Sequence, residues 1–148
     1  MVELLTVIFI IAILTAIASP SFFSWVESAK YKDAALGVAS DLRFGRQTAV
    51  TDNRETRVEF NLGGKRYRLT EGNLASSSTS WSTVKSWDYI EAEVNWVTGT
   101  TCNGSADMNI TFRPNGSSGG GTICINDTVG ANRYKVVVST ISGRVDVQ

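Results

Sequence analysis

The stretch MVELLTVIFIIAILTAIASP, residues 1–20, decides the fold. It carries one charged side chain, Glu3, at the edge of an almost unbroken apolar run. Over the 15 or so residues from 4 to 18, only Thr6 and Thr15 are polar. Both hydroxyls can bond back to carbonyl groups of their own helix. The run therefore predicts a helix that is apolar on every side.

Three kinds of segment could carry such a helix. A secretory signal peptide needs a basic leading region, and this chain has an acid there. A core helix that is apolar on every side needs a much larger domain around it than this chain provides. A membrane-resident helix remains, and residues 1–2 and 19–23 extend the run toward the roughly 20 residues that cross a bilayer. Pro20 lacks a backbone N–H, so we expect it to kink this helix.

Composition excludes several other functions. The 148-residue chain has 14 acidic and 14 basic residues, so net charge gives no general attraction to a polyanion. It has no histidine, no phosphate-binding loop and no pattern of a catalytic triad. We therefore expect no enzyme, no metal site and no cofactor. Cys102 and Cys124 are either free thiols or a disulfide, and we favour the disulfide because the rest of the chain points outside the cytoplasm.

The second part of the chain predicts an amphipathic helix followed by a sheet. A stripe at alternating spacings of four and three consists of Tyr31, Ala35, Val38, Leu42, Gly45 and Ala49. Thr51-Asp52-Asn53 should end the helix near Val50. Strands are then expected at 57–61 and 66–70 as a hairpin, at 89–97, at 109–112 and 121–125 as a second hairpin, and at 134–139 and 144–147. A Ser/Thr-rich loop is expected at 75–83.

The N-terminal motifs resemble a known class of proteins. Val2-Glu3-Leu4-Leu5, the apolar run 8–18 and Ser19-Pro20-Ser21-Phe22 resemble the N-terminus of type IV pilins and type II secretion pseudopilins. In that class a prepilin peptidase cuts the chain, the new N-terminus is methylated, and the acid is the fifth residue. Here it is the third, so we expect that two leading residues precede Met1 or that the processing site departs from the pattern, and we favour the first.

Later motifs resemble the GspH/FimT/FimU group of minor pilins and pseudopilins. They are DLRFGRQTAV (41–50), ITFRPNG (110–116) with GGTI (120–123), VVVS (136–139) and SGRV (142–145). The resemblance implies an α+β, type IV pilin-like fold. Residues 1–25 would form the transmembrane and filament-core helix, and residues 26–148 a globular head with an antiparallel sheet.

The resemblance also implies a function. The chain would be a structural subunit of a type IV pilus or a type II secretion pseudopilus. Its partners would be other pilin or pseudopilin subunits, the prepilin peptidase and the inner-membrane assembly platform. It would cross the bacterial inner membrane once before assembly, and afterwards lie in a periplasmic pseudopilus or an extracellular pilus. Glu3 would pair with the N-terminal amine of a neighbouring subunit and set the axial register.

An alternative is a minor pilin that binds DNA during DNA uptake. Some members of the group bind DNA through a C-terminal Gly-Arg-x-Arg element, and this chain has Gly143-Arg144-Val145-Asp146. The acid in the last position repels phosphate. Arg133, Lys135 and Arg144 remain as a possible small patch, but we do not expect nucleic acid as a partner. A monotopic membrane protein that never polymerises is a further alternative.

Four aromatic side chains allow two interpretations. Trp81, Trp87 and Trp96 with Tyr89 could form a stacking surface or could pack in the core. We favour the core.

Overall fold

The computed structural model describes the backbone of residues 2–90 and 94–148, and the side chains of these residues outside 16–24. The chain divides into two compact units, Met1–Lys30 and Tyr31–Gln148, which we describe separately. One helix, α1 (Val2–Asp52), contributes to both. The predicted single helix to about Val50 is therefore present.

In the first unit, residues 2–15 of α1 are almost all apolar and are exposed to solvent. Every large apolar side chain described from Val2 to Leu14 is 44% to 78% exposed. The hydroxyl of Thr6 donates to the carbonyl of Val2 at 2.9 Å, and that of Thr15 donates to the carbonyl of Ile11 at 2.9 Å. These bonds satisfy the only polar side chains of the run, as the sequence predicts.

Two expectations concern the middle of this segment. Pro20 lies in 16–24, whose side chains are outside the described part of the structure, so its kink stays a prediction. Within the residues that the structure describes, no helix combines the length and the apolar character needed to cross a membrane.

In the second unit, the predicted stripe of α1 is buried. Tyr31, Ala35, Val38, Leu42, Gly45 and Ala49 all face the interior. The helix ends where the sequence predicts, because Asn53 adopts a left-handed conformation with φ of 51°. The N–H of Arg54 then bonds to the carbonyl of Ala49 at 3.3 Å. An asparagine in this conformation is a common way to end a helix.

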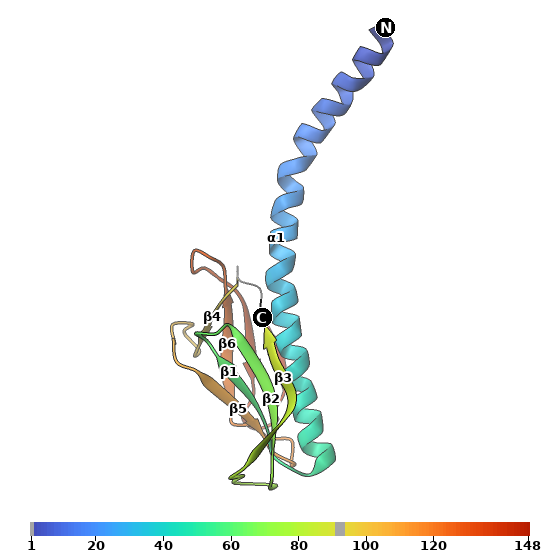
Figure 1. The fold of residues 1–148 in the computed structure, drawn as a ribbon. Coiled ribbons are helices and arrows are strands. Elements are labelled where there is room, and N and C mark those ends of the chain that lie inside the picture. The colour runs from blue at the N-terminus through green and yellow to red at the C-terminus, as the bar shows by residue number, and fades with distance from the viewer. Residues whose placement is uncertain (1, 91–93) are drawn as a thin grey trace. The chain divides into compact units, whose positions relative to one another are not determined.

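The described residues after α1 form eight strands in two antiparallel sheets. The first sheet has the order β3-β2-β1-β5 and the second β4-β6-β7-β8. Figure 1 shows the sheets beside the C-terminal half of α1. The strands are β1 (Thr56–Asn61), β2 (Arg66–Gly72), β3 (Trp81–Tyr89), β4 (Asn95–Thr98), β5 (Met108–Phe112), β6 (Gly121–Asn126), β7 (Asn132–Val138) and β8 (Val145–Val147).

A single core joins the helix to both sheets. Its largest fully buried side chains include Leu42 from α1, Phe60 from β1 and Ile123 from β6. The rings of Phe60 and Trp96 lie 5.6 Å apart, so the two sheets meet through aromatic contacts. Burial of each such large side chain contributes on the order of 1.5–3 kcal/mol, which makes this core the main source of stability of the head.

The strand predictions are partly confirmed. β1 pairs with β2, as the first predicted hairpin requires, and β7 pairs with β8, as expected for the last pair of strands. The predicted hairpin of 109–112 with 121–125 is wrong. β5 pairs with β1 in the first sheet and β6 with β4 and β7 in the second, because the linker of turn residues crosses between the sheets.

The region 75–97 also differs from expectation. β3 occupies 81–89, where the sequence predicts the end of a loop and the start of a strand at 89. β3 is a solvent-facing edge strand, so its side chains lack the apolar alternation that burial imposes. Residues 91–93 of the predicted strand 89–97 lie outside the described residues, and β4 covers its end.

The Ser/Thr-rich loop between β2 and β3 is held by two side chains. Asn73 Oδ1 accepts the N–H groups of Thr79 and Ser80 at 3.1 Å each. Glu55 Oε2 accepts the N–H of Ser78 at 2.8 Å. Burial by itself would raise the pKa of Glu55, but the hydrogen bonds from this loop and the charge of Arg113 outweigh it and lower the pKa below 4.5. The ionised carboxylate therefore anchors the loop.

Candidate functional site

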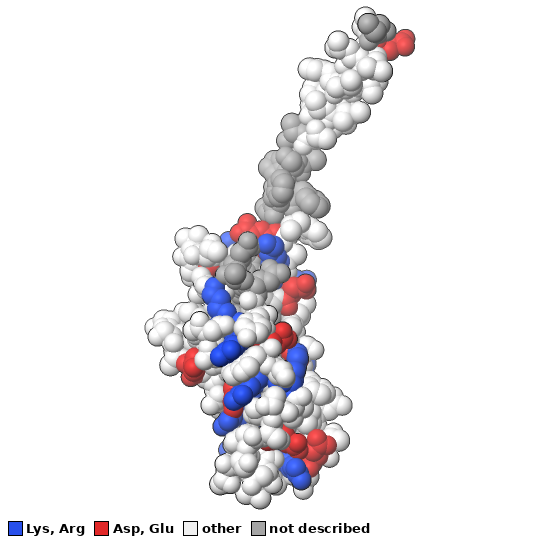
Figure 2. All heavy atoms as spheres, in the orientation of Figure 1, with Lys and Arg blue, Asp and Glu red and all other residues white. Residues whose placement is uncertain are grey.

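The first candidate surface is the N-terminal apolar segment. Glu3 is exposed, and it is the sole charged side chain from Met1 to Val26. Figure 2 shows the described part of this segment as uncharged surface apart from an acid near the end of the chain. An exposed apolar surface of this size marks a site that another apolar surface covers.

The second candidate lies in the head, where three motifs of the sequence meet at Arg46. This residue of α1 donates its Nε–H to the carbonyl of Gly116 at 3.2 Å and to that of Ser142 at 3.1 Å. One guanidinium thus joins the helix to the β5–β6 and β7–β8 connections. Gly143 has φ of +61°, and a Cβ there would lie 2.3 Å from the carbonyl oxygen of Gly116. Glycine is required at this crossing of the two connections.

Arg43 makes a second link between α1 and the end of the chain. Its Nη2 donates to the carbonyl of Val145 at 3.0 Å. Beside it lies a cavity of about 570 Å³, lined by Arg43, Arg46, Ser142, Gly143, Arg144, Val145 and Asp146. Arg144 Nε donates to Asp146 Oδ1 at 2.8 Å, and this ion pair forms part of the cavity wall.

The structure does not gather the three cations of the predicted nucleic-acid patch. Arg133 lies at an irregularity in the pairing of β7 with β6 and stacks over the ring of Tyr31, whereas Lys135 lies opposite Cys124, so the two-residue spacing does not place these cations on one face. Arg144 lies opposite Ser139, whose N–H bonds to its carbonyl, and is therefore about 13 Å along the strand from Lys135. Arg133 also pairs with the buried carboxylate of Asp127 at 3.0 Å.

An arginine–tryptophan face covers the outer side of the first sheet, where the sequence analysis favoured core packing of Trp81 and Trp87. The guanidinium of Arg57 lies 4.1 Å from the ring centre of Trp81, and that of Arg68 lies 4.6 Å from the ring centre of Trp87. Glu59 accepts hydrogen bonds from Arg57 and, at 2.6 Å, from Arg68. Burial by itself would raise the pKa of Glu59, but these two arginines outweigh it and lower the pKa below 4.5.

The four aromatic side chains are thus divided. Trp96 packs in the core, as favoured, with 7% of its surface exposed. Trp81 and Trp87 are half-buried beneath arginines, and Tyr89 is exposed. The preference for core packing is therefore wrong for three of the four. Aromatic residues at 81 and 87, six apart, were a signal of one strand face that the sequence analysis did not use.

A polar cluster fastens the edge strand β3 to α1. Tyr67 Oη donates to Asp41 Oδ2 at 2.6 Å, and Lys85 Nζ donates to the same oxygen at 2.7 Å. Burial and the nearby acids raise the pKa of Tyr67 well above 10, so the phenol stays protonated and keeps donating. The cluster positions β3, and its polar groups are hydrogen-bonded to one another.

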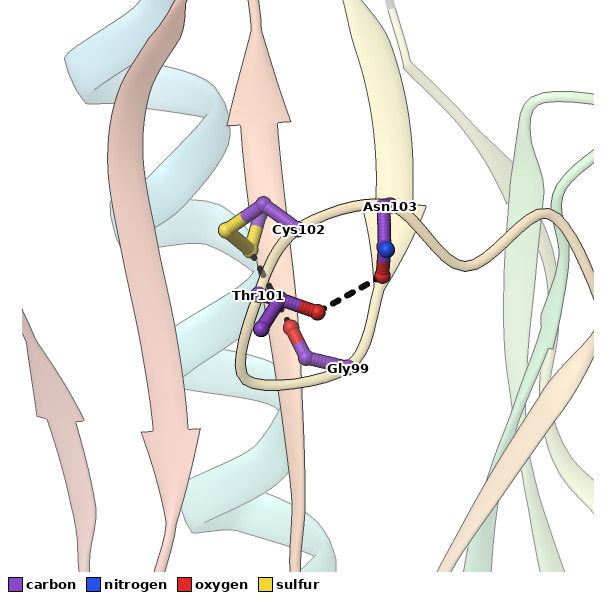
Figure 3. The surroundings of a disulfide bond; sticks show 5 residues. Gly99, Thr101, Cys102 and Asn103 are labelled. Atoms are coloured by element: carbon purple, nitrogen blue, oxygen red, sulfur yellow. Dashed lines mark hydrogen bonds between the residues drawn. A yellow bond between two sulfur atoms is a disulfide. The ribbon is translucent and has the colours of Figure 1, made fainter.

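The predicted disulfide is present. Cys102 and Cys124 are bonded with a Cα–Cα distance of 5.6 Å, and they lie 22 residues apart in the sequence. Figure 3 shows Cys102 in a tight loop that starts at Gly99, and Cys124 is a fully buried residue of β6. The loop is closed by the pair of backbone hydrogen bonds between Thr98 and Gly104. The disulfide therefore holds this loop over β6, an interior strand of the second sheet.

Among the residues that the structure describes, no three histidine, cysteine, aspartate or glutamate side chains lie close enough together to hold a metal ion. The head instead offers surfaces, an arginine-lined cavity and stacked aromatic rings.

The fold defines a class of protein. A long N-terminal helix, bare and apolar at its start and packed on antiparallel sheets in its second half, is the architecture of type IV pilin-like proteins. The family model for the type II transport protein GspH matches residues 34–143, so the chain belongs to the GspH family.

Solved structures share the fold. The minor pseudopilin EpsH of the Vibrio cholerae type 2 secretion system matches with a TM-score of 0.63 and 10% identity, over 80% of this chain and 96% of that one. The type IV minor pilin FimU of Pseudomonas aeruginosa matches with a TM-score of 0.60 and 21% identity, over 84% and 92%. GspH of E. coli matches with a TM-score of 0.61 and 11% identity, over 83% and 90%. No curated protein matches the sequence.

Proposed function

We propose that this chain is a structural subunit of a type II secretion pseudopilus or a type IV pilus and that it assembles through its N-terminal helix. One observation carries the proposal, namely the all-round exposure of apolar side chains from Val2 to Leu14. Complete burial of one such side chain contributes on the order of 1.5–3 kcal/mol. Their sum gives this segment a strong tendency to leave water, and a bundle of like helices or a bilayer can cover every side of it.

Glu3 supplies specificity to this apolar helix. In a dry helical bundle, an unpaired carboxylate costs several kcal/mol, so it needs a positively charged partner. The N-terminal amine of a neighbouring subunit is the partner that the class offers. Because only one stagger of two helices pairs these charges, Glu3 sets the axial register more than it adds stability.

The same helix explains the steps before assembly. While the chain is a monomer, the bilayer of the bacterial inner membrane covers the apolar segment, and the head stands in the periplasm. A prepilin peptidase processes the N-terminus, and the assembly platform moves the subunit from the membrane into the filament. Family membership supports these partners, because they serve pilins and pseudopilins as a class.

The test removes the charge and leaves the apolar surface. Glu3→Ala is expressed as the full chain in cells that carry the assembly machinery, with Asp33→Ala as a control that removes an exposed acid from the same helix. Quantitative blotting of sheared or cross-linked filaments and of membranes measures the distribution. We expect the membrane amount of Glu3→Ala to be unchanged, because loss of a charge favours insertion, and its filament amount to fall sharply. Assembly of Glu3→Ala at the level of Asp33→Ala would contradict the proposed role.

A further inference from the structure

The cavity between α1 and the β7–β8 connection is built from three guanidinium groups and one carboxylate. Arg43 and Arg46 come from adjacent turns of the helix, while Arg144 and Asp146 come from the end of the chain. The lining carries three positive charges and one negative charge, so it is positive overall in a chain whose net charge is zero. We propose that this cavity binds a carboxylate carried by a neighbouring protein subunit. The inference rests on the proposed function, because a filament supplies that neighbour.

Free donors on the two helix arginines support this inference. Arg43 uses one N–H group on the carbonyl of Val145, and Arg46 uses its Nε–H on two carbonyls. Within the described part of the chain, the remaining N–H groups of these two guanidiniums have no hydrogen-bond acceptor. A planar guanidinium with two parallel N–H groups matches the two oxygens of a carboxylate.

The site is also organised before a ligand arrives. Arg46 is held by the carbonyls of Gly116 and Ser142, and a Cβ at Gly143 would lie only 3.1 Å from its Cδ. Its side chain therefore has little freedom left to lose when it binds a partner. Preorganised side chains give affinity mainly because this cost has already been met during folding.

The surroundings favour a protein segment over a polyanion. A second cavity of about 490 Å³ shares Arg43 and Arg46 and is otherwise lined by the uncharged residues Gln47, Val50 and Thr51. Val50 is 50% exposed, and Ile141, next to Ser142 in the chain, is 88% exposed. Nucleic acid requires a row of cations, and Asp146 interrupts the cations here. An acidic side chain flanked by apolar residues fits both the charges and the neighbouring apolar groups.

Substitution of Asp146 should change binding of a carboxylate in the opposite direction from substitution of Arg43. Its carboxylate occupies Nε–H of Arg144, so it competes with an incoming carboxylate. Asp146→Asn should strengthen binding, whereas Arg43→Gln should weaken it about tenfold, since a charge-assisted hydrogen bond is lost. If this region had a purely structural role, Asp146→Asn would not strengthen binding while Arg43→Gln weakened it.

The experiment uses the full chain in detergent micelles, labelled with ¹⁵N, and follows the arginine Nε–H signals by NMR. The probe is a hexaglutamate peptide with blocked ends, and Lys32→Gln is the control because it removes an exposed cation of α1 outside the cavity. We expect saturable shifts at Arg43, Arg46 and Arg144, tighter binding by Asp146→Asn, weaker binding by Arg43→Gln and no change in Lys32→Gln. Absence of saturation, or equal weakening by Lys32→Gln, would overturn the proposal.

A second titration distinguishes a protein carboxylate from a nucleic-acid phosphate as the ligand. It also allows the carboxylate site and the proposed function to be tested separately. An oligothymidylate of the same charge replaces the peptide, and tighter binding of this DNA at the same arginines would overturn the assignment to a protein carboxylate. The titration needs no filament. If the native chain does not enter filaments while the peptide binds as expected, the proposed function fails and the carboxylate site stands. If the native chain enters filaments and the peptide does not bind, the carboxylate site fails and the proposed function stands.

Discussion

Arg46 shows how a single residue joins the helix to two connections that are distant in the sequence. Its two hydrogen-bond acceptors lie 70 and 96 residues away in the sequence. The two glycines at this crossing, Gly116 and Gly143, both have positive φ and leave room for the guanidinium. Sequence motifs that look like separate turns are therefore parts of one joint between the helix and two connections.

Glu59 leads to a prediction about acid stability. Because the pKa of Glu59 in the folded head lies below 4.5, its contribution is complete above that value and is lost as the pH falls through the lowered pKa. Glu59→Gln should reduce the free energy of unfolding at pH 7 by about 1.5–3 kcal/mol, the range for hydrogen bonds to charged groups. The deficit should shrink as both proteins are acidified to pH values below the lowered pKa of Glu59.

Denaturant unfolding of the full chain in detergent, followed by near-UV circular dichroism at neutral and at acid pH, measures this difference in the free energy of unfolding. Glu71→Gln is the control, because Glu71 lies on neighbouring β2 and its side chain makes a long ion pair of 3.8 Å with Arg54. We expect less than about 1 kcal/mol for the control, as for exposed ion pairs. A deficit of Glu59→Gln that does not depend on pH would contradict the assignment.

At the scale of elements, β6 is an interior strand of the second sheet and is buried on both faces. One face meets the core through Ile123 and Ile125, and the other carries Thr122, Cys124 and Asn126, which are also buried. The disulfide loop that begins at Gly99 contributes to the cover over Cys124. This loop therefore acts as an extra layer over the strand.

Loss of the disulfide should destabilise the head. Closing a loop of 22 residues removes chain entropy from the unfolded state, and the estimate for that length is about 3 kcal/mol. Denaturant unfolding of the full chain, intact and as the Cys102→Ser/Cys124→Ser double variant, gives the difference. Mass spectrometry after alkylation without reduction should find no free thiol, and two alkylated cysteines in the periplasmic protein would refute the bridge.

The elements also show what the sequence reveals and what it conceals. The buried stripe of α1 follows the 3.6-residue period, so residues such as Ala35 and Leu42 could be assigned without a structure. β3 lacks the alternation of buried and exposed residues that marks a core strand, since arginines rather than the core cover Trp81 and Trp87. The separation of β5 from β6 depends on long-range pairing with β1, which local turn residues do not encode.

The same contrast holds for the candidate sites. Glu3 stands out because a charge beside an apolar run has a cost that is visible in the sequence. Cys102 and Cys124 stand out because they are the only two cysteines. The cavity around Arg43 and Arg46 could not be predicted, because its lining comes from two parts of the chain that meet only in the folded head.

For the whole molecule, the distribution of charge predicts weak binding of DNA. Figure 2 shows basic and acidic groups intermixed over the visible face of the head, and net charge is zero. Arg133 and Arg144 are each paired with an aspartate. Gel-shift titration of the full chain in detergent, at about the physiological 150 mM salt, should show no saturation at submicromolar protein.

Asp146→Arg should strengthen this DNA binding, and more at low salt than at high salt, because each added phosphate contact steepens the salt dependence by about one unit. Arg54→Gln, which removes an exposed cation elsewhere on the head, should have little effect by comparison. Tight and saturable binding by the native chain would favour a DNA receptor over a filament subunit.

The central claim is that the N-terminal helix enters the core of a filament, and one cross-linking measurement tests it most directly. The two native cysteines are joined to each other, so Ile8→Cys places a single free thiol in the apolar segment. A second single thiol is introduced at the corresponding depth of a filament subunit in the same cells, and mild oxidation is followed by non-reducing electrophoresis. We predict a cross-linked pair in cells with the assembly machinery, lost without the machinery and reduced by Glu3→Ala. Equal cross-linking with and without the machinery, or none at any depth along the helix, would contradict the account.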